Sequence, residues 1–302
     1  MERQVSGFER IALIGFGEVG QILAEDLAAA GITKITAYDL KFADAGSIPT
    51  GALATHKVRA AASAVEAVRE AELILCAVTA ASDLDAAKSV VPGLKPGAFY
   101  VDFNSASPGM KKTAAAIIDG AGGRYVEAAV MTPIGPKRIA SRMLLGGTHA
   151  AEFQTRAAPL GFKGEVFSED LGKASATKMC RSVMIKGVES LLTESMLAAR
   201  HYGVEHVVLG SLSDLLPIGD WEKLAQYMIS RSLEHGVRRA EEMREVAETV
   251  REAGLAPLMS AACAERQDWA AAYKSALAAP DLDGMLDAIL NNIGQSPEGK
   301  KP

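Results

Sequence analysis

Short apolar runs alternate with helix-like segments through the first half of the chain. The runs have the length and composition of buried strands and lie at residues 10–15, 35–39, 73–78, 98–103, 124–130 and 142–147. The segments between them have helical periodicity, among them "QILAEDLAAAG", "SAVEAVREA" and "GMKKTAAAIIDGAG". This alternation predicts an open, mainly parallel sheet with helices on both faces.

The pattern changes after about Ser168, where strand signals stop and helical spacing continues. Helices are predicted at 170–202, 205–214, 220–233, 236–254, 257–276 and 283–292, with breaks at "PIGD" (217–220), "AGLAP" (253–257) and "APD" (279–281). The terminal segment "GQSPEGKKP" is polar, and we expect it to be disordered. The predicted fold class is therefore an α/β domain at 1–167 followed by an all-α C-terminal domain at 168–302.

Charge and composition narrow the functional classes. The net charge of −5 gives no support for nucleic-acid binding, which needs a basic face. No apolar run approaches the roughly 18 residues of a membrane span, and the start, "MERQVSGFERIALIGFG", lacks the pattern of a signal peptide. The three cysteines are far apart, and no His, Cys, Asp or Glu cluster has metal-ligand spacing. We expect a cytoplasmic protein that acts on a small molecule and holds no metal.

A glycine-rich turn joins the first predicted strand to the first helix in "IALIGFGEVGQILAEDL". In this context Gly15 allows the tight turn, Gly17 lets the backbone approach a pyrophosphate, and Gly20 permits close packing of helix and strand. The start of the helix offers N–H groups and the positive end of its dipole to the phosphates. The pattern predicts a dinucleotide-binding Rossmann domain. The candidate cofactor contacts at the turn are Gly15, Phe16, Gly17, Glu18, Val19 and Gly20.

Asp39 ends the second predicted strand, 19 residues after Gly20. An acid at this point can accept hydrogen bonds from the adenosine ribose hydroxyls and repels a 2′-phosphate, so NAD is favoured over NADP. Lys41 could offset that repulsion, which leaves NADP possible. The alternative is that Asp39 is a solvated acid at a strand end.

Lys178 stands in a mostly small and apolar helical stretch, "LGKASATKMCRSVMIKG" (171–187). A buried amine is costly unless it is paired or its pKa falls, so the residue calls for an explanation. A proton-transfer role is one interpretation, and a solvated or paired lysine is the other. Lys186, on nearly the same helix face, is the rival candidate.

Four stretches together carry a resemblance to a known family: "GFGEVG" (15–20), "VDFNSASPG" (101–109), "VEAAVMTPIGP" (126–136) and "GKASATKMCRS" (172–182). They resemble the glycine-rich turn, the Asp-x-Ser/Asn-Ser/Thr-x-x-Pro loop, the substrate loop and the catalytic helix of the β-hydroxyacid dehydrogenases. This superfamily includes 3-hydroxyisobutyrate and 6-phosphogluconate dehydrogenases. The resemblance is to a little-characterised branch with its own helical C-terminal domain.

The resemblance implies a role for Lys178 as the general acid/base that faces the nicotinamide. "SED" (168–170) would then supply the N-cap and first-turn acids of its helix. Ser105 should lie near the nicotinamide and could touch the substrate oxygen, although it could equally be a turn residue. The further cofactor candidates, beyond the ends of predicted strands, are Val78, Thr79 and Asn104.

Two departures from the family pattern concern the substrate. Ser182 stands where the family has an Asn, and the Ser-Gly-Gly run of the substrate loop is replaced by "MTPIGP" (131–136). The loop keeps Thr132 and Gly135 as candidate contacts, with Pro133 between them removing an N–H donor. We expect a larger or less acidic substrate than a simple 3-hydroxy acid.

In the helical half, "SLEHGVRRAEEM" (232–243) lies where the family has a second cofactor-contacting lysine motif. His235, Arg238 or Arg239 could replace that lysine, and His235 is the candidate to reach the substrate. The alternative is that all three are ordinary surface or interface residues.

The expected function is that of an NAD(P)-dependent oxidoreductase acting on a small hydroxy compound or the matching carbonyl. The resemblance also implies a homodimer formed through the helical domain. Two alternatives stay open: an imine reductase on the same scaffold, which typically lacks the lysine, and an NAD(P)-binding sensor protein without turnover.

Overall fold

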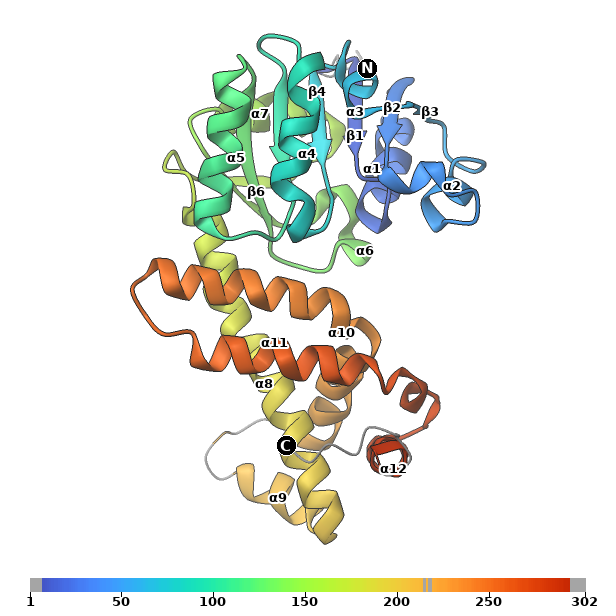
Figure 1. The fold of residues 1–302 in the computed structure, drawn as a ribbon, viewed down its shortest axis with the longest axis vertical. Coiled ribbons are helices and arrows are strands. Elements are labelled where there is room, and N and C mark those ends of the chain that lie inside the picture. Colours follow the sequence, from blue (N-terminus) through green and yellow to red (C-terminus); the bar gives the residue numbers. More distant parts are fainter. Residues whose placement is uncertain (1–6, 214–215, 217–218, 294–302) are drawn as a thin grey trace. The chain divides into compact units, whose positions relative to one another are not determined.

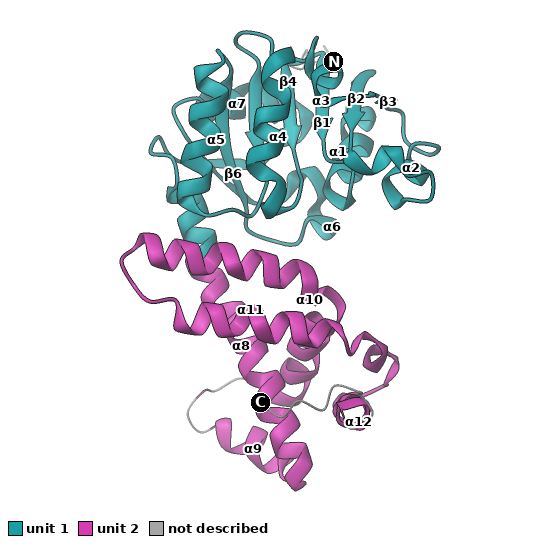
Figure 2. Cartoon of the chain, viewed as in Figure 1, with its two compact units in different colours: residues 1–179 teal, residues 180–302 magenta. Residues whose placement is uncertain are grey.

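The computed structural model describes residues 7–213, 216 and 219–293 (Figure 1). The predicted disordered tail at 294–302 and part of the predicted break at 217–220 lie outside the described residues. The chain divides into two compact units, residues 1–179 and 180–302, shown in different colours in Figure 2. Each unit is described separately below.

The first unit is built on a sheet of eight strands in the order β3-β2-β1-β4-β5-β6-β7-β8. Neighbouring strands are parallel except for β6 and β7, which are antiparallel. The predicted Rossmann architecture is thus confirmed. The strands are β1 (Arg10–Ile14), β2 (Lys34–Tyr38), β3 (Arg59–Ala60), β4 (Leu73–Cys76), β5 (Phe99–Asp102), β6 (Arg124–Val130), β7 (Met143–Gly146) and β8 (Gly164–Ser168).

Helices cover both faces of this sheet, as Figure 1 shows. In β1, Ile11 and Leu13 enter one apolar core, and Ala12 and Ile14 enter the other, because successive side chains of a strand point to opposite faces. Both faces being buried explains why these strands read as unbroken apolar runs. The helices are α1 (Glu18–Ala29), α2 (Ile48–Ala52), α3 (Ala64–Val68), α4 (Asp83–Val90), α5 (Pro108–Gly120), α6 (Ile134–Lys137) and α7 (Ala150–Ala157), with 3₁₀ turns η1 (Leu40–Ala43), η2 (Ala80–Ser82), η3 (Val91–Gly93), η4 (Arg138–Ala140) and η5 (Ala158–Leu160).

The second unit is helical, as predicted, around a core that includes Met196, Ile229 and Leu286. Its elements are the greater part of α8 (Lys173–Tyr202), then α9 (Glu205–Leu212), α10 (Trp221–Glu252), α11 (Leu258–Ala271), η6 (Lys274–Ala278) and α12 (Leu282–Ile293). Among the described residues, none of the helices combines the length and apolar character needed to cross a membrane.

The prediction of two helices at 220–233 and 236–254 is wrong, because α10 runs through both ranges without a break. Gly236 lies inside the helix, where a Cβ would clash with the carbonyl oxygen of Gln267 and lie 2.9 Å from the Cβ of Ala271. The glycine therefore permits close packing of α10 against α11 and does not end a helix. The helix predicted at 257–276 stops at Ala271 and is followed by the 3₁₀ turn η6.

The expected start of the lysine-bearing helix is also corrected. Ser168 belongs to β8, and its Oγ accepts the N–H of Asp170, so "SED" does not cap α8. The helix begins at Lys173, after Gly172 in the left-handed region at φ +95°. The division between the two units falls inside α8, after residue 179, whereas the sequence suggested a boundary after residue 167.

Candidate functional site

The carboxyl ends of five neighbouring parallel strands meet at one edge of the sheet, where ligands of open α/β folds bind. Each strand is followed there by candidate residues. They are the glycine-rich turn after β1, Asp39 after β2, Val78 and Thr79 after β4, Asn104 and Ser105 after β5, and Thr132 after β6. The topology therefore gathers most of the sequence candidates of the first unit at this edge.

The glycine-rich turn has the geometry that a dinucleotide needs. Gly15 has φ +92°, and a Cβ there would clash with the carbonyl oxygen of Ala77. A Cβ at Gly20 would clash with the carbonyl oxygen of Gly15, so α1 packs directly against the turn. At Gly17, by contrast, no atom of the described residues lies within 4 Å of a Cβ position, which leaves open space at the start of α1. The turn therefore fits a pyrophosphate placed against Gly17 and the N-terminus of α1.

Asp39 holds this turn to the end of β2. Its Oδ2 accepts the N–H of Phe16 at 2.7 Å, and its Oδ1 accepts the N–H of Lys41 at 2.8 Å. The ring of Phe16 is buried and packs edge-on against Phe42 and His56. Asp39 is thus more than a solvated acid at a strand end, and Phe16 is a core residue that fixes the turn. Of the remaining turn candidates, Glu18 is exposed and Val19 is half-buried.

Asn104 ties the ends of β4 and β5 together. The side chain is buried, its Oδ1 accepts the N–H of Val78 at 2.7 Å, and its Nδ2 donates to Asp83 Oδ1 at 2.8 Å. Val78 in turn lies against the turn, with Cγ1 only 3.0 Å from a Cβ position at Gly15. Thr79 is exposed, with Oγ1 3.3 Å from Ser82 Oγ. Asn104 therefore holds Val78 and the end of β4 in place. Its direct contact with a cofactor stays a prediction.

A network of buried charged and polar side chains lies next to Asn104, and sequence analysis missed it. Its members are Asp83, Asp102, Lys111 and Tyr125. Lys111 of α5 places Nζ 2.6 Å from Asp102 Oδ1 and 3.7 Å from Asp83 Oδ2, and Tyr125 donates its hydroxyl to Asp102 Oδ2 at 2.7 Å. Burial raises the pKa of Asp83 to about 7, although Lys111 acts in the opposite direction. Burial lowers the pKa of Lys111, but the two carboxylates more than compensate and raise it overall. The only sequence signal was Asp102 inside an apolar run.

Lys178 meets Ser105 at the same edge. Its Nζ donates to Ser105 Oγ at 2.7 Å, and both side chains are half-buried. Ser105 follows directly after Asn104, so the buried network holds the turn that carries it. An amine and a hydroxyl in hydrogen-bond contact at the carboxyl edge of a Rossmann sheet can move a proton to or from a substrate oxygen.

The rival lysine is already paired. Lys186 Nζ donates to Glu242 Oε2 at 2.5 Å within the helical unit, and Glu242 also pairs with Arg238 at 3.3 Å. Arg239 forms an ion pair with Glu189, a buried acid whose pKa is raised by burial. These pairings disfavour Lys186 as the acid/base, and contact of Arg238 or Arg239 with a cofactor stays a prediction.

Two candidate substrate residues belong to the helical unit. Ser182 is buried, and His235 is half-buried with Nε2 3.2 Å from Glu234 Oε2. Burial, followed by the nearby Arg231 and Arg238, lowers the pKa of His235. Contact of either residue with a substrate stays a prediction.

The predicted substrate loop is exposed at Thr132, Pro133 and Gly135. Pro133 precedes the one-turn helix α6, which includes Gly135, so the loop is partly helical. It ends at Arg138, which has φ +52° and is held to α1 by Asp26 at 2.7 Å and Glu25 at 2.6 Å. The anchoring explains why a non-glycine residue keeps a positive φ there.

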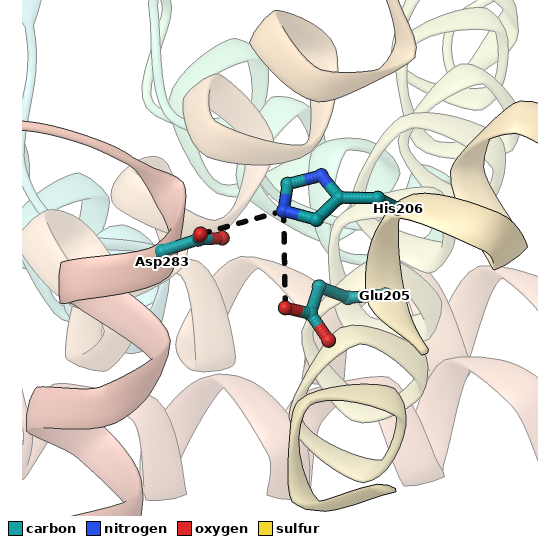
Figure 3. Close-up of side chains that lie close together, drawn as sticks. All are labelled: Glu205, His206 and Asp283. Atoms are coloured by element: carbon teal, nitrogen blue, oxygen red, sulfur yellow. Dashed lines mark hydrogen bonds and ion pairs between the residues drawn. The ribbon is translucent and has the colours of Figure 1, made fainter. Parts of the chain in front are cut away.

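In the helical unit, the fold brings Asp283 close to the adjacent residues Glu205 and His206, from which it is distant in sequence (Figure 3). His206 Nε2 lies 3.4 Å from Asp283 Oδ2 and 3.8 Å from Glu205 Oε1. Arg200 already pairs with Glu205 at 2.5 Å and with Asp283 at 3.3 Å. A guanidinium thus supplies the positive charge of this cluster, and no metal is assigned to it.

A mainly parallel sheet with a pyrophosphate-type turn and an acid at the end of β2 defines a dinucleotide-binding domain of the Rossmann class. Comparison with known families agrees. Residues 10–159 match the NAD binding domain of 6-phosphogluconate dehydrogenase. Residues 199–270 match a domain of unknown function, DUF1932.

Solved structures cover nearly the whole chain. A conserved hypothetical protein from Sinorhizobium meliloti 1021 is 34% identical, with a TM-score of 0.73 over 96% of this chain and 97% of that one. The conserved protein MTH1747, described as similar to 3-hydroxyacid dehydrogenases, is 30% identical, with a TM-score of 0.67 over 86% of this chain and 96% of that one. The Mycobacterium tuberculosis 3-hydroxyisobutyrate dehydrogenase shares the fold at 17% identity, with a TM-score of 0.70 over 94% of this chain and 99% of that one. The chain belongs to the β-hydroxyacid dehydrogenase superfamily, in a branch with its own helical C-terminal domain.

Proposed function

We propose that this protein is an NAD(P)-dependent dehydrogenase or reductase that acts on the CH–OH group of a small molecule, or on the matching carbonyl. Family membership supports an oxidoreductase with a nicotinamide cofactor. The observation that carries the finer proposal is the 2.7 Å contact between Lys178 Nζ and Ser105 Oγ at the carboxyl edge of the sheet.

When bound, the nicotinamide supplies the hydride acceptor or donor. The chain supplies the proton transfer: Lys178 takes the hydroxyl proton as a carbonyl forms, or returns it in the reverse direction. Ser105 holds the lysine amine and donates its own hydroxyl toward the substrate oxygen. Thr132 and Gly135, in the exposed loop after β6, contact the rest of the substrate.

Asp39 supports NAD as the preferred cofactor. Its carboxylate accepts two backbone N–H groups at the end of β2, and a negative charge at this strand end would repel a 2′-phosphate. The nearby Lys41 is exposed and could offset this charge only in part.

A homodimer through the helical unit is part of the proposal. Met184, Leu191 and Ala198 recur every seven residues along α8 and are exposed, a spacing typical of a helix face that packs against another helix. Light scattering on wild type and Leu191→Glu tests this: the variant should be monomeric, and a monomeric wild type would contradict the dimer.

The experiment compares wild type, Lys178→Ala and Lys173→Ala. Lys173 is the matched control, an exposed lysine on the same helix that pairs with Asp170 at 2.7 Å. NADH and NADPH binding is measured by fluorescence, followed by turnover on a panel of hydroxy acids, sugar acids and alcohols. All three proteins should bind NADH alike, and only Lys178→Ala should lose turnover. Equal turnover in Lys178→Ala and wild type would refute the assignment, and NADH binding without turnover on the panel would favour a sensor.

A further inference from the structure

Glu127 is a fully buried acid in the middle of β6, and the proposed function gives it no role. Its carboxylate accepts two backbone N–H groups from one turn. Oε2 accepts the N–H of Gly172 at 2.8 Å, and Oε1 accepts the N–H of Ser175 at 2.5 Å. Both donors stand at the start of α8, the helix that carries Lys178.

The helix needs this carboxylate because its own sequence offers no cap. A helix usually satisfies the N–H of its third residue with the side chain of its N-cap residue. Ser175 is the third residue of α8, and the position before the helix is Gly172, which has no side chain. Glu127 thus replaces the missing N-cap side chain from a strand that lies far earlier in the chain. A carboxylate also complements the positive end of the helix dipole.

The surroundings leave little room for another arrangement. Gly146 pairs with Glu127 across β6 and β7, and a Cβ at Gly146 would lie 2.6 Å from Glu127 Oε2. On the other side, a Cβ at Gly172 would lie 3.1 Å from the Cβ of Pro108, the first residue of α5. The start of α8 is therefore close-packed beside the start of α5, and Ser105 lies in the turn that leads into α5.

We propose that Glu127 is a positioning residue: by capping the first turn of α8 from β6, it sets where Lys178 Nζ meets Ser105 Oγ. Lys178 follows Ser175 by less than one helical turn, so a rotation or shift of the first turn moves its amine directly. The inference rests on the proposed role of Lys178, and its test also works without turnover.

The change Glu127→Gln removes this cap with little change in volume. The glutamine Oε1 can accept one of the two N–H groups, but its NH₂ faces the other one. A buried donor is then left unpaired, and a movement of the helix start relieves the cost of burying it. Gly146→Ala is the second variant, because it keeps the carboxylate and pushes it out of place.

The readout is the NMR signal of Lys178 after reductive ¹³C-methylation of the lysines. Lys178→Arg identifies the signal, and Ser105→Ala gives its position when the hydroxyl contact is lost. In Glu127→Gln and Gly146→Ala we expect the signal to move toward the Ser105→Ala position, while NADH affinity stays within about twofold. Glu165→Gln, an exposed acid on β8, is the matched control and should leave the signal unchanged. Where turnover is found, kcat should fall by about tenfold to a hundredfold, the loss expected for a misplacement approaching 1 Å.

An unmoved Lys178 signal in both Glu127→Gln and Gly146→Ala would overturn the positioning role, whatever the protein catalyses. Failure of the proposed function has a different signature. If wild type turns over no compound of the panel but the signal still moves, Glu127 positions Lys178 and the dehydrogenase assignment is what fails.

Discussion

Asp83 is the side chain whose replacement tests the buried network most directly. Two carboxylates share one ammonium: Lys111 lies 2.6 Å from Asp102 but 3.7 Å from Asp83, and all three are buried. In Asp83→Asn, the new Oδ1 can still accept the amide of Asn104, and the shorter Lys111–Asp102 pair stays intact. The variant therefore removes the ionisable group of Asp83 and keeps the hydrogen bond to Asn104.

The expected effect depends on pH. An unfolded chain has an Asp pKa of about 3.9, whereas burial raises the pKa of Asp83 to about 7. The folded state thus holds a proton that the unfolded state has released, and ionising Asp83 destabilises the fold. This penalty is absent below about pH 4, grows as the pH rises to about 7 and is constant above that. Its slope is at most about 1.4 kcal/mol per pH unit. Asp83→Asn lacks it and should gain stability relative to wild type across this window.

Urea unfolding of both proteins between pH 5 and pH 8, followed by far-UV circular dichroism, measures the difference. Tryptophan fluorescence serves as an internal reference, because both tryptophans, Trp221 and Trp269, lie in the helical unit. Asp85→Asn is the matched control, an exposed acid in the same first turn of α4. Parallel pH curves for wild type and Asp83→Asn would refute the reasoning, as would a variant whose deficit grows toward pH 8.

Three further predictions use glycines and the strand-end acid. Gly236→Ala should destabilise the helical unit by about 1–3 kcal/mol, because the Cβ meets the backbone of α11. Gly210→Ala, where the described residues leave open space, should stabilise the helical unit by up to about 1 kcal/mol. Urea unfolding midpoints measured by tryptophan fluorescence compare the two variants, and equal midpoints would contradict the packing argument. Gly17→Val should weaken NADH binding about tenfold or more without changing the melting temperature, because the valine side chain would fill the open space where the pyrophosphate is expected. An unchanged affinity in a fluorescence titration would place the pyrophosphate elsewhere. Asp39→Asn should lower the ratio of NADPH to NADH dissociation constants about tenfold, because a charge repulsion near 4 Å costs on the order of 1–4 kcal/mol; an unchanged ratio would remove Asp39 from cofactor selection.

The sheet was predictable because its strands are buried on both faces and leave unbroken apolar runs. The two missed strands show the limit of that signal. β3 has only two residues, and the central residues of the edge strand β8 are exposed, so neither leaves an apolar run. The predicted break in α10 was wrong because Gly236 serves the close packing of α10 against α11, and a contact with another helix leaves no local sequence pattern.

In the candidate site, too, features with a local sequence pattern were predictable and long-range contacts were not. The glycine-rich turn is a local pattern and could be identified from spacing alone. Lys178 and Ser105 were each expected near the nicotinamide only through the family resemblance, and their direct contact, between segments 73 residues apart, was not predicted. Glu127 left no more than one weak sign, an acid inside the apolar strand "RYVEAAV". Its partners are backbone N–H groups 45 and 48 residues away, which no side-chain pattern records.

The capping of α8 from β6 has a consequence for the order of folding. The cap is a long-range contact, so the first turn of α8 cannot be completed before β6 has found its place in the sheet. During synthesis the sheet emerges first, and the start of α8 then forms on a carboxylate that is already fixed. A fragment that began at Lys173 would lack this template, and its first turn would fray.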